Sequence, residues 1–440
     1  MACNIGLVSL GCAKNQTDAE TMLAILKDDG YKIVAEPETA DIIIVNTCGF
    51  IDSAKQESIN AILEMAEYKT CGQCKKLVVT GCLAERYADD IIAELPEVDA
   101  ILGTGDYDRI IEVIKSVDKM PVITNNINRT PECELPRVLL TPPYTAYLKI
   151  ADGCDNNCTY CAIPKIRGHF RSRKPEDIIA EANQLANAGV RELILIAQDT
   201  TRYGTDIGTS LAKLLDELVK IKKIEWIRVH YYYTEAITKE LIDTMAKYDK
   251  ICNYIDMPIQ HADNYILRRM ARRTTVEEID EKINYMRNTL PNCYIRTSII
   301  VGFPGETEEH FQNLYNFVKR TRFDRMGVFT YSCEEGTAAA EFDAQVDEDV
   351  KEARYNKLME LQQGISLELN REKIGSIIEV IVEGYDEDNY LFFGRGRGDS
   401  IDVDGKVYFG TEDEVTPGDI IKVKILDASE YDLTGQRVLI

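Results

Sequence analysis

The sequence predicts an α/β protein of three successive parts: an N-terminal parallel α/β domain, a central partial (β/α)6 barrel and a small C-terminal antiparallel β-barrel. Residues 3–118 and 144–370 alternate short apolar segments with amphipathic helical ones, which is typical of parallel sheets. Residues 371–440 instead contain short β segments punctuated by glycines, which indicates a small barrel. The length of 440 residues leaves room for several hydrophobic cores.

In the first region we expect strands at residues 4–10, 41–45 and 76–80 and helices at residues 18–28 and 53–68. The first helix is expected to end at Gly30. A linker is predicted over residues 119–143, because prolines are dense there. These prolines are Pro121, Pro131, Pro136, Pro142 and Pro143.

The second region contains six strand candidates, fewer than the eight of a closed (β/α) barrel. They are residues 144–150, 192–197, 226–230, 254–259, 294–301 and 325–331. A helix is expected at residues 175–188, where Pro175 suits the first turn. In the third region β segments are expected at residues 376–382, 389–395, 406–409 and 420–426.

The composition restricts the class of protein. No apolar run is long enough for a membrane span, and no basic region followed by an apolar one opens the chain, so a cytoplasmic protein is expected. Thirteen cysteines in such a protein indicate metal binding or catalysis rather than disulfides. The net charge of −23 disfavours a phosphate backbone and favours a basic protein as partner, although many soluble proteins are simply acidic.

The sharpest motif is Cys154-x3-Cys158-x2-Cys161, which follows a predicted strand. Three thiolates on one loop can bind three irons of a cubane cluster. The fourth iron then stays open for a small molecule that carries an amine and a carboxylate. Structural zinc is the alternative, but zinc needs a fourth ligand, for which His169 is the nearest candidate.

Three further cysteines, Cys12, Cys48 and Cys82, each follow a predicted strand of the first region and have a glycine beside them. The carboxyl ends of parallel strands share one edge of the sheet, where open α/β folds bind ligands. We therefore expect these thiols to lie together, although they are far apart in the sequence. The alternative is that they pack as small buried apolar side chains.

On these residues the chain resembles the radical S-adenosylmethionine (SAM) superfamily, and within it the methylthiotransferase family, over nearly its whole length. The resemblance includes a C-terminal TRAM domain. It implies one 4Fe–4S cluster on Cys12, Cys48 and Cys82. A second 4Fe–4S cluster, which binds SAM, is implied on the motif of residues 154–161.

The resemblance also implies residues that contact SAM or the substrate. The superfamily's usual Gly-Gly-Glu segment is absent here. Some of these implied contacts have a structural alternative. Residue 160 could be a plain core tyrosine, and residues 302–305 could form a turn followed by a helix that begins with residue 306. The implied residues are Tyr160, near the adenine, and Gln198, Asp199, Gly302, Gly305 and Glu306.

Three basic residues after the cysteine loop, Arg167, Arg171 and Arg173, are candidates to bind a carboxylate of SAM or of an acidic substrate side chain. A solvated loop is the alternative. His261, after the fourth strand of the second region, is a candidate proton carrier.

The remaining cysteines carry weaker signals. The pair Cys71-x2-Cys74 has the spacing of a zinc or redox pair, but it lies outside the family pattern, so we expect it to be structural. The isolated cysteines are also expected to be structural. They are Cys3, Cys133, Cys252, Cys293 and Cys333.

The methylthiotransferase family modifies either a tRNA adenosine or an aspartate of a small-subunit ribosomal protein. The segment of residues 11–18, with Lys14, resembles the ribosomal-protein type, as do residues 198–200 and 260–262. Residues 371–440 contain 8 Lys and Arg against 16 Asp and Glu, a net −8, whereas an RNA-binding barrel should be basic. The predicted substrate is therefore ribosomal protein S-twelve, with tRNA as the alternative.

The resemblance implies a reaction in two parts. One SAM methylates a sulfur at the N-terminal cluster. A second SAM takes an electron, supplied by a donor such as flavodoxin or ferredoxin, and yields a 5′-deoxyadenosyl radical. That radical removes a hydrogen from the aspartate β-carbon, where the methylthio group couples. A non-catalytic iron–sulfur electron carrier or scaffold is the alternative of another class.

Overall fold

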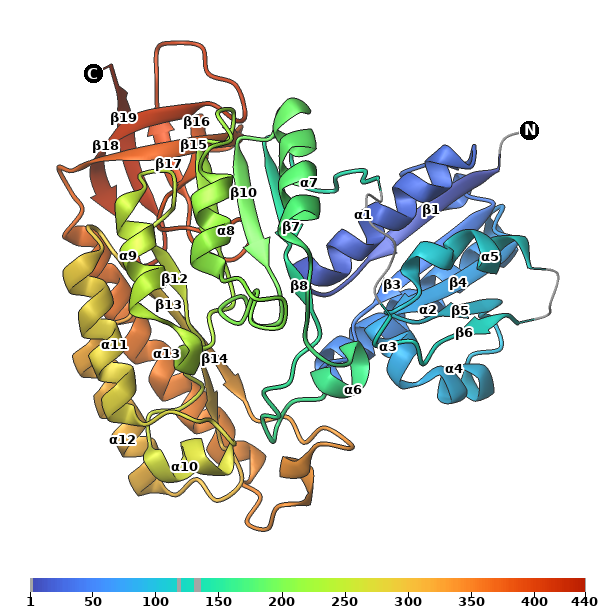
Figure 1. Cartoon of the computed structure of the whole chain (residues 1–440), viewed down its shortest axis with the longest axis horizontal. Helices are drawn as coiled ribbons and strands as arrows, with labels where there is room; N and C mark the ends of the chain where they lie inside the picture. Colours follow the sequence, from blue (N-terminus) through green and yellow to red (C-terminus); the bar gives the residue numbers. More distant parts are fainter. Residues whose placement is uncertain (1–2, 117–119, 130–135, 440) are drawn as a thin grey trace.

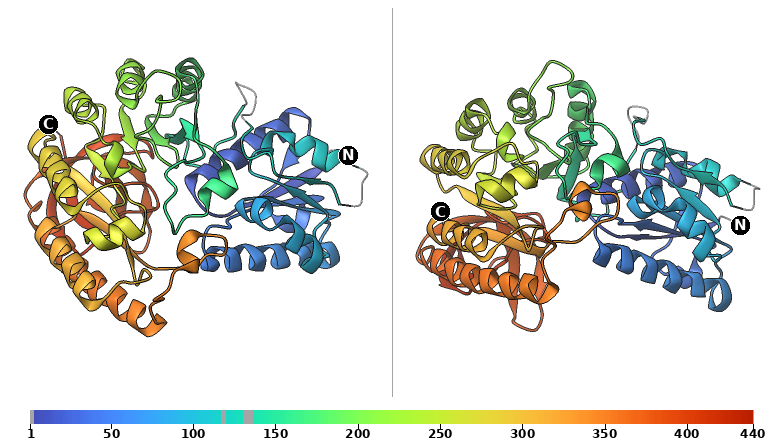
Figure 2. Two further views of the ribbon diagram at one scale, coloured as in Figure 1. Left: turned by 60° about the horizontal axis from the view of Figure 1, so that its bottom comes forward. Right: turned by 90° about the horizontal axis from the view of Figure 1, so that it is seen from below.

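The computed structural model describes residues 3–116, 120–129 and 136–439; Pro131 and Cys133 lie outside these ranges. An N-terminal α/β domain and a C-terminal barrel pack on different sides of a central half-barrel (Figures 1 and 2). Within the described part of the chain, no helix is both long enough and apolar enough to cross a membrane. The predicted fold class is confirmed.

The N-terminal domain is a six-stranded sheet in the order β2-β1-β3-β4-β5-β6, and every pair of neighbours is parallel. The three expected strands are β1 (Asn4–Ser9), β3 (Ile42–Thr47) and β4 (Lys76–Gly81). The others are too short to show periodicity in sequence: β2 (Lys32–Ile33), β5 (Ala100–Leu102) and β6 (Val122–Ile123). The sheet thus extends into the segment that was expected to be a linker.

Helices cover both faces of this sheet. One face is packed by α1 (Ala13–Asp28) and α5 (Ile110–Lys115), and the other by α2 (Asp52–Cys71), α3 (Cys82–Arg86) and α4 (Ala88–Glu94). The first helix begins at Ala13 rather than at residue 18. Its first turn carries polar side chains that are buried, including Lys14 and Asn15, so apolar periodicity does not reveal it.

The central half-barrel contains all six expected strands, in two parallel sheets of three. They are β7 (Thr145–Lys149), β10 (Glu192–Ile196), β11 (Trp226–Val229), β12 (Tyr254–Asp256), β13 (Tyr294–Val301) and β14 (Arg325–Thr330). A parallel bridge between Ile227 and Ile251 connects the two sheets. Along β13 alternate residues are fully buried against the outer helices, and the others face the lumen.

Six helices form the outer layer: α7 (Pro175–Asn187), α8 (Leu211–Leu218), α9 (Lys239–Lys247), α11 (Val276–Thr289), α12 (Glu308–Thr321) and α13 (Glu348–Arg371). Shorter elements occupy the loops: β8 (Ala151–Asp152), α6 (Ile163–Arg167), β9 (Arg171–Ser172) and α10 (Asn264–Arg269). Four 3-10 turns complete the described elements: η1 (Pro37–Thr39), η2 (Tyr107–Arg109), η3 (Thr234–Ala236) and η4 (Ala338–Glu341).

The C-terminal domain is a closed five-stranded barrel in the order β15-β16-β17-β19-β18. Its strands are β15 (Ile377–Asp386), β16 (Leu391–Gly396), β17 (Val407–Gly410), β18 (Ile420–Ala428) and β19 (Leu433–Val438). The small barrel is antiparallel as expected except at one pair, because β17 pairs with β19 in parallel. The fifth strand was missed, since its glycine and polar residues hide the alternation; it closes the barrel and removes both free edges.

One segment of the C-terminal barrel, residues 395–404, fills the lumen of the half-barrel; we call it the plug segment. The Ser400 hydroxyl lies 2.9 Å from Nε2 of His230, and Tyr254 donates to Asp404 at 2.7 Å. Ile401, only 4% exposed, packs against inward-facing apolar side chains of β7 and β10. The plug segment thus enters from the amino ends of the strands and forms the floor of the half-barrel.

A buried carboxylate anchors the plug segment. Glu192, on β10, accepts hydrogen bonds from Arg228 and Arg395, and all three side chains are at most 2% exposed. Burial opposes ionisation of Glu192, but Arg395 and Arg228 outweigh it and lower its pKa to about 2. The ion cluster therefore joins the two domains through a charged carboxylate.

Replacing Glu192 by Gln should loosen this joint, because the neutral amide leaves the buried guanidinium group of Arg228 without a counter-charge and leaves Arg395 with Glu383 alone. Removing one partner of a buried ion pair costs about 3–5 kcal/mol. Urea denaturation can be followed by the fluorescence of Trp226, the only tryptophan in the sequence, which packs against Ile381 of the C-terminal barrel. At neutral pH we expect the urea concentration at the unfolding midpoint to be lower for Glu192→Gln than for the unmodified protein.

Glu217→Gln is the matched control, since this carboxylate pairs with Lys220 at the exposed surface. It should change stability by less than about 0.5 kcal/mol. Because the pKa of Glu192 is about 2 in the folded protein, its contribution is complete above about pH 4.3 and is lost as the pH falls toward 2. The difference in urea midpoint between Glu192→Gln and the unmodified protein should therefore become smaller as the pH falls over that range. Equal midpoints at neutral pH would contradict the anchoring role.

Candidate functional site

The first three predicted cysteines lie at one edge of the N-terminal sheet. Cys12, Cys48 and Cys82 directly follow β1, β3 and β4 or the short connection after them, and these strands are neighbours in the sheet. Each thiol lies within electrostatic range of the others. We call these residues the N-terminal triad. The parallel topology, rather than closeness in sequence, brings them together.

Close backbone approach at this edge depends on glycine. Gly81 has a φ of +94°, and a Cβ there would lie 2.5 Å from the carbonyl oxygen of Thr47. At Gly11, with a φ of +88°, a Cβ would lie 3.0 Å from the Cβ of Cys48. A side chain at either position would push the cysteine-bearing loops apart.

Asn15, in the first turn of α1, organises the N-terminal triad. Its amide nitrogen donates to the carbonyl oxygen of Thr47 at 2.7 Å, and its Oδ1 lies 3.4 Å from Sγ of Cys82. The same Oδ1 accepts a hydrogen bond of 2.6 Å from Arg167. Sequence reasoning did not single out Asn15; the signal was an amide three residues after Cys12 in a helix that begins at the cysteine.

Arg167 was predicted to bind a carboxylate of SAM or substrate, but the structure directs it toward the N-terminal triad. Its Nη2 lies 3.9 Å from Sγ of Cys82, and its Nη1 lies 2.9 Å from Asp18 and 3.3 Å from Asp152. Lys149 contacts both of these carboxylates as well. Asp18, Lys149, Asp152 and Arg167 form a buried charge network, which we call the interface network, between α1 and the half-barrel.

Burial and cations act in opposite directions on these thiols. Burial raises the pKa of Cys82 to about 12, even though Arg167 is close. At Cys12, an exposed residue, the surrounding protein also takes some water from the thiol and so opposes its ionisation, but Lys14 and Arg167 outweigh this and lower the pKa. The two thiols of one site thus differ in how readily they lose a proton.

The other three predicted cysteines, Cys154, Cys158 and Cys161, occupy the loop between β8 and α6 and interact electrostatically with one another. We call them the loop triad. Asn156 donates to Asp199 at 2.8 Å and ties this loop to the end of β10. The loop triad directly precedes α6, which packs against α3, and Cys82 of the N-terminal triad packs against Ile166 of α6.

Tyr160, inside the loop triad, lies against an apolar cluster at the mouth of the half-barrel. This cluster contains Ile266, Met270, Phe303, Tyr331 and Ala339. Burial raises the pKa of Tyr160 well above its ordinary value. The ring is therefore part of an apolar wall next to the cysteines.

The other predicted SAM contacts lie along the same rim. Gln198 donates to Asp152 at 3.1 Å, while its Oε1 is buried without a partner among the described residues. Asp199 is fully buried, and burial raises its pKa. Gly302 has a φ of +71°, and Glu306 accepts from its backbone N–H at 2.8 Å.

The structural alternative for this segment, a turn with a helix cap, is present, but the helix does not start at Glu306. The helix α12 begins at Glu308 with Thr307 as its N-cap, and Glu306 folds back onto the turn before it. Its Oε1 pairs with Arg354 at 2.9 Å. A buried carboxylate in this turn needs these donors, and they leave it unable to serve the helix start.

His261 is fully buried, and neither ring nitrogen has a hydrogen-bond partner among the described residues. Its Nε2 lies 3.4 Å from Oε2 of Glu306. Arg171 donates to the carbonyl oxygens of residues 167 and 169, and Arg173 pairs with Glu181 at 2.6 Å. The guanidinium groups of both arginines are therefore engaged within the protein.

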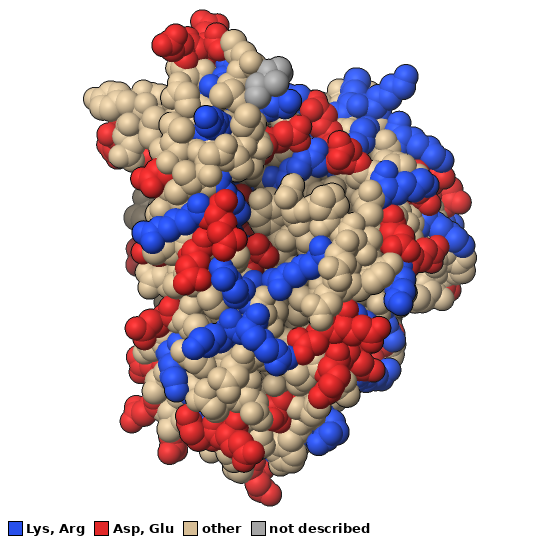
Figure 3. All heavy atoms as spheres, turned by 90° about the vertical axis from the view of Figure 1, so that its left-hand side faces the viewer, with Lys and Arg blue, Asp and Glu red and all other residues tan. Residues whose placement is uncertain are grey.

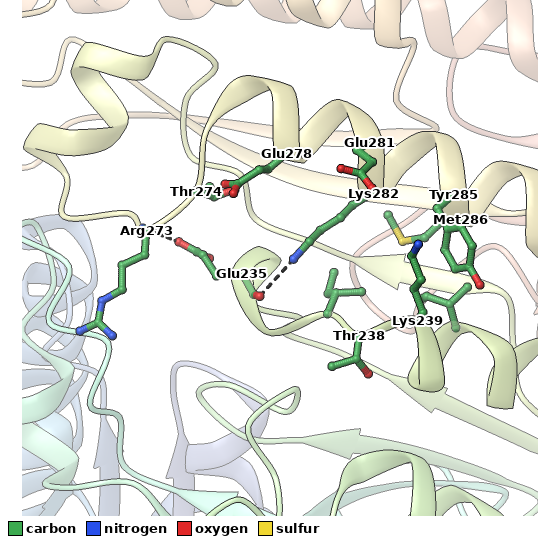
Figure 4. Close-up of a pocket in the computed structure, with 12 residues that line it drawn as sticks. Glu235, Thr238, Lys239, Arg273, Thr274, Glu278, Glu281, Lys282, Tyr285 and Met286 are labelled. Carbon is green, nitrogen blue, oxygen red and sulfur yellow. Dashed lines mark hydrogen bonds between the residues drawn. The ribbon is translucent and has the colours of Figure 1, made fainter.

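Several candidates lie away from this site. Cys71 and Cys74 precede β4, at the sheet edge opposite Cys82. His169 is exposed and faces Asp155. A separate cavity of about 280 Å³ lies between α9 and α11 on the outer layer, where Lys282 donates to backbone oxygens of η3 (Figure 4). None of these joins the two triads.

Comparison with known proteins identifies each part. Residues 148–318 match the radical SAM superfamily, residues 4–103 match the uncharacterized protein family UPF0004, and residues 374–438 match the TRAM domain. A radical SAM methyltransferase from Kitasatospora setae, TsrM, has a similar fold, with a TM-score of 0.55 at 13% identity over 75% of each chain.

Two similar relatives are both ribosomal protein uS12 methylthiotransferases named RimO. The one from Clostridioides difficile is 53% identical over 98% of each chain, and the one from Pelotomaculum thermopropionicum is 50% identical over 100% of each. Such identity over the whole length overturns the alternative of a non-catalytic electron carrier. The chain belongs to the RimO family of methylthiotransferases and is a radical SAM transferase.

Proposed function

We propose that this enzyme adds a methylthio group to the β-carbon of an aspartate in ribosomal protein uS12, using SAM and two 4Fe–4S clusters. The observation that carries the proposal is that two separate cysteine triads meet near α6: the loop triad directly precedes this helix, and Cys82 of the N-terminal triad packs against it. Relatives that bear the uS12 name match the whole chain. Two triads correspond to the two tasks of the reaction: supplying the methylthio group and supplying the radical.

The N-terminal triad would hold one cluster, and the loop triad would hold the cluster whose open iron binds SAM. A single metal ion needs its ligands within roughly 4 Å of one another. Among the described residues, no three Cys, His, Asp or Glu side chains meet the requirements of such a site. Cluster thiolates are spread more widely, because each binds a different iron. The clusters, when bound, supply the electron and the sulfur chemistry.

The protein's own residues position the reactants and exclude water. Tyr160 and its apolar cluster would bury the adenine, and the unpartnered Oε1 of Gln198 would accept a hydrogen bond from SAM. Apolar walls also protect a radical from side reactions. The roles of Asp199, Gly302, Gly305 and Glu306 at SAM, and of His261 as a proton carrier, stay predictions.

Charge favours a basic protein over RNA as the substrate, because the chain has a net charge of −23. The acidic TRAM barrel, however, lies at the amino ends of the half-barrel strands, whereas the triads lie at carboxyl ends. Acidic and basic side chains are interleaved on the face seen in Figure 3. The attraction would therefore act by steering uS12 over a distance rather than at the reacting atoms.

Action on a ribosomal protein would place the enzyme in the cytoplasm.

The substrate can be tested anaerobically with reconstituted, reduced enzyme and SAM. Purified uS12 and an unmodified tRNA are offered in separate reactions, and the intact masses of both are recorded. We expect a gain of one methylthio group on uS12, localised to an aspartate, and no gain on the tRNA. A gain on the tRNA alone would overturn the proposed substrate.

Separate roles for the two triads predict separable losses of activity. Methylthiolation should fall at least about 100-fold in each of the variants Cys12→Ala, Cys48→Ala and Cys82→Ala, because removing a ligand weakens binding of the cluster at that triad. Reductive SAM cleavage should stay measurable in all three. Cys161→Ala should abolish both activities. The products to quantify are 5′-deoxyadenosine and methylthiolated uS12.

Cys71→Ala and Cys74→Ala are the matched controls, since both cysteines lie at the opposite edge of the same sheet. They should keep both activities. Loss of all SAM cleavage in the N-terminal triad variants, with the other cluster spectroscopically intact, would be incompatible with separate roles.

A further inference from the structure

Lys14 is a buried cation without a carboxylate partner. The residue is only 8% exposed, and its ammonium group forms no ion pair with any residue that the structure describes. The neighbouring cations differ, since Lys149 contacts Asp18 and Asp152, and so does Arg167. Burying an ammonium group without an anion is costly. An anion from outside the chain would relieve this cost.

The ammonium group of Lys14 lies over an aromatic ring of the other domain. Its Nζ is 3.3 Å from the ring centroid of Tyr231, which follows β11 at the rim of the half-barrel. A ring face orients a cation without neutralising it, so the charge stays available to an anion. The ammonium group thus bridges the N-terminal domain and the half-barrel.

Tyr231 is held in a strained backbone conformation. Its φ is +58°, a region that non-glycine residues rarely adopt. Asp256 accepts from its backbone N–H at 3.1 Å, and its carbonyl oxygen accepts from the backbone N–H of Thr200 at 3.1 Å. Strain that the surroundings enforce in this way is concentrated at functional sites.

The segment of residues 231–233 reaches toward both triads. Tyr231 contacts Lys14, two residues after Cys12, and the hydroxyl of Tyr233 lies 3.4 Å from Sγ of Cys158. Ala13 and Tyr231 pack on the apolar cluster that contains Ile401 of the plug segment. Lys14 therefore lies between the two triads, above the floor of the half-barrel.

We propose that Lys14, oriented by the ring of Tyr231, binds the side-chain carboxylate of the substrate aspartate. This inference rests on the proposed function. An ammonium group offers three donors to a carboxylate, and binding there would hold the adjacent β-carbon between the triads. Lys14 is then a specificity-determining residue that accepts aspartate and discriminates against its neutral analogue asparagine.

The competing role for Lys14 is to balance the negative charge of a cluster on the N-terminal triad. Both Lys14 and Arg167 lower the pKa of Cys12, and Arg167 also approaches Sγ of Cys82 at 3.9 Å. Of the two cations, only Lys14 has its ammonium group on a ring of the half-barrel, and this placement favours the substrate as its anion. Cluster spectra of a Lys14 variant distinguish the two roles.

The test is a binding measurement with reconstituted full-length enzyme, without reductant. The probes are purified uS12 and the same protein with its methylthiolated aspartate, located by mass, replaced by Asn. Unmodified enzyme should bind the Asp form at least about tenfold more tightly, since hydrogen bonds to charged groups are the strong ones. Lys14→Met, similar in length but neutral, should lose this preference while keeping iron content and cluster spectra.

Lys213→Met, on the exposed face of α8, removes the same charge and should retain the preference. If Lys14→Met still prefers the Asp form of uS12 by the same ratio of affinities, the inference about Lys14 is overturned while the proposed function stands. If that ratio is unchanged and the cluster spectra are altered, Lys14 is assigned to the cluster. Unmodified enzyme that binds both forms equally would overturn the role of Lys14. If uS12 also gains no methylthio group, the proposed function fails with it.

Discussion

The interface network is the interaction on which the arrangement of the site depends. Asp18 comes from the helix that follows Cys12, Lys149 ends a barrel strand, Asp152 precedes the cysteine loop and Arg167 ends the helix after it. Because each carboxylate contacts both cations, the two domains are fixed in one mutual orientation. Burial opposes ionisation of Asp152, but the cations Lys149 and Arg167 outweigh it and hold the pKa of this carboxyl below its ordinary value.

This network fixes the positions of two cysteine triads from different folds relative to each other. The N-terminal triad belongs to an open parallel sheet, and the loop triad belongs to a half-barrel. Arg167 connects the two domains, since it ends α6, the helix that follows the loop triad, and approaches Cys82. A shift of one domain would therefore separate the two triads from each other and would also separate Lys14 from Tyr231.

The two ends of the half-barrel have different tasks. Its carboxyl ends carry the loop triad and the rim residues, and its amino ends are filled by the plug segment of the TRAM barrel. Glu192 and its two arginines hold the plug segment in place. The TRAM barrel is thus an acidic surface and also forms part of the floor beneath the site.

The sequence by itself determined the fold class, the six barrel strands and the positions of both sets of cysteines, because apolar periodicity and short motif spacings are local properties. It did not reveal β19, the early start of α1, or the partners of Arg167 and Glu306. Each of these involves polar residues whose burial only tertiary packing decides: Asn15 and Lys14 look like solvent-facing helix residues until the fold covers them. Tertiary structure alone decides which buried charges meet, because the partners lie apart in the sequence: Arg167 and Asp18 come from different domains, and Glu306 and Arg354 are 48 residues apart.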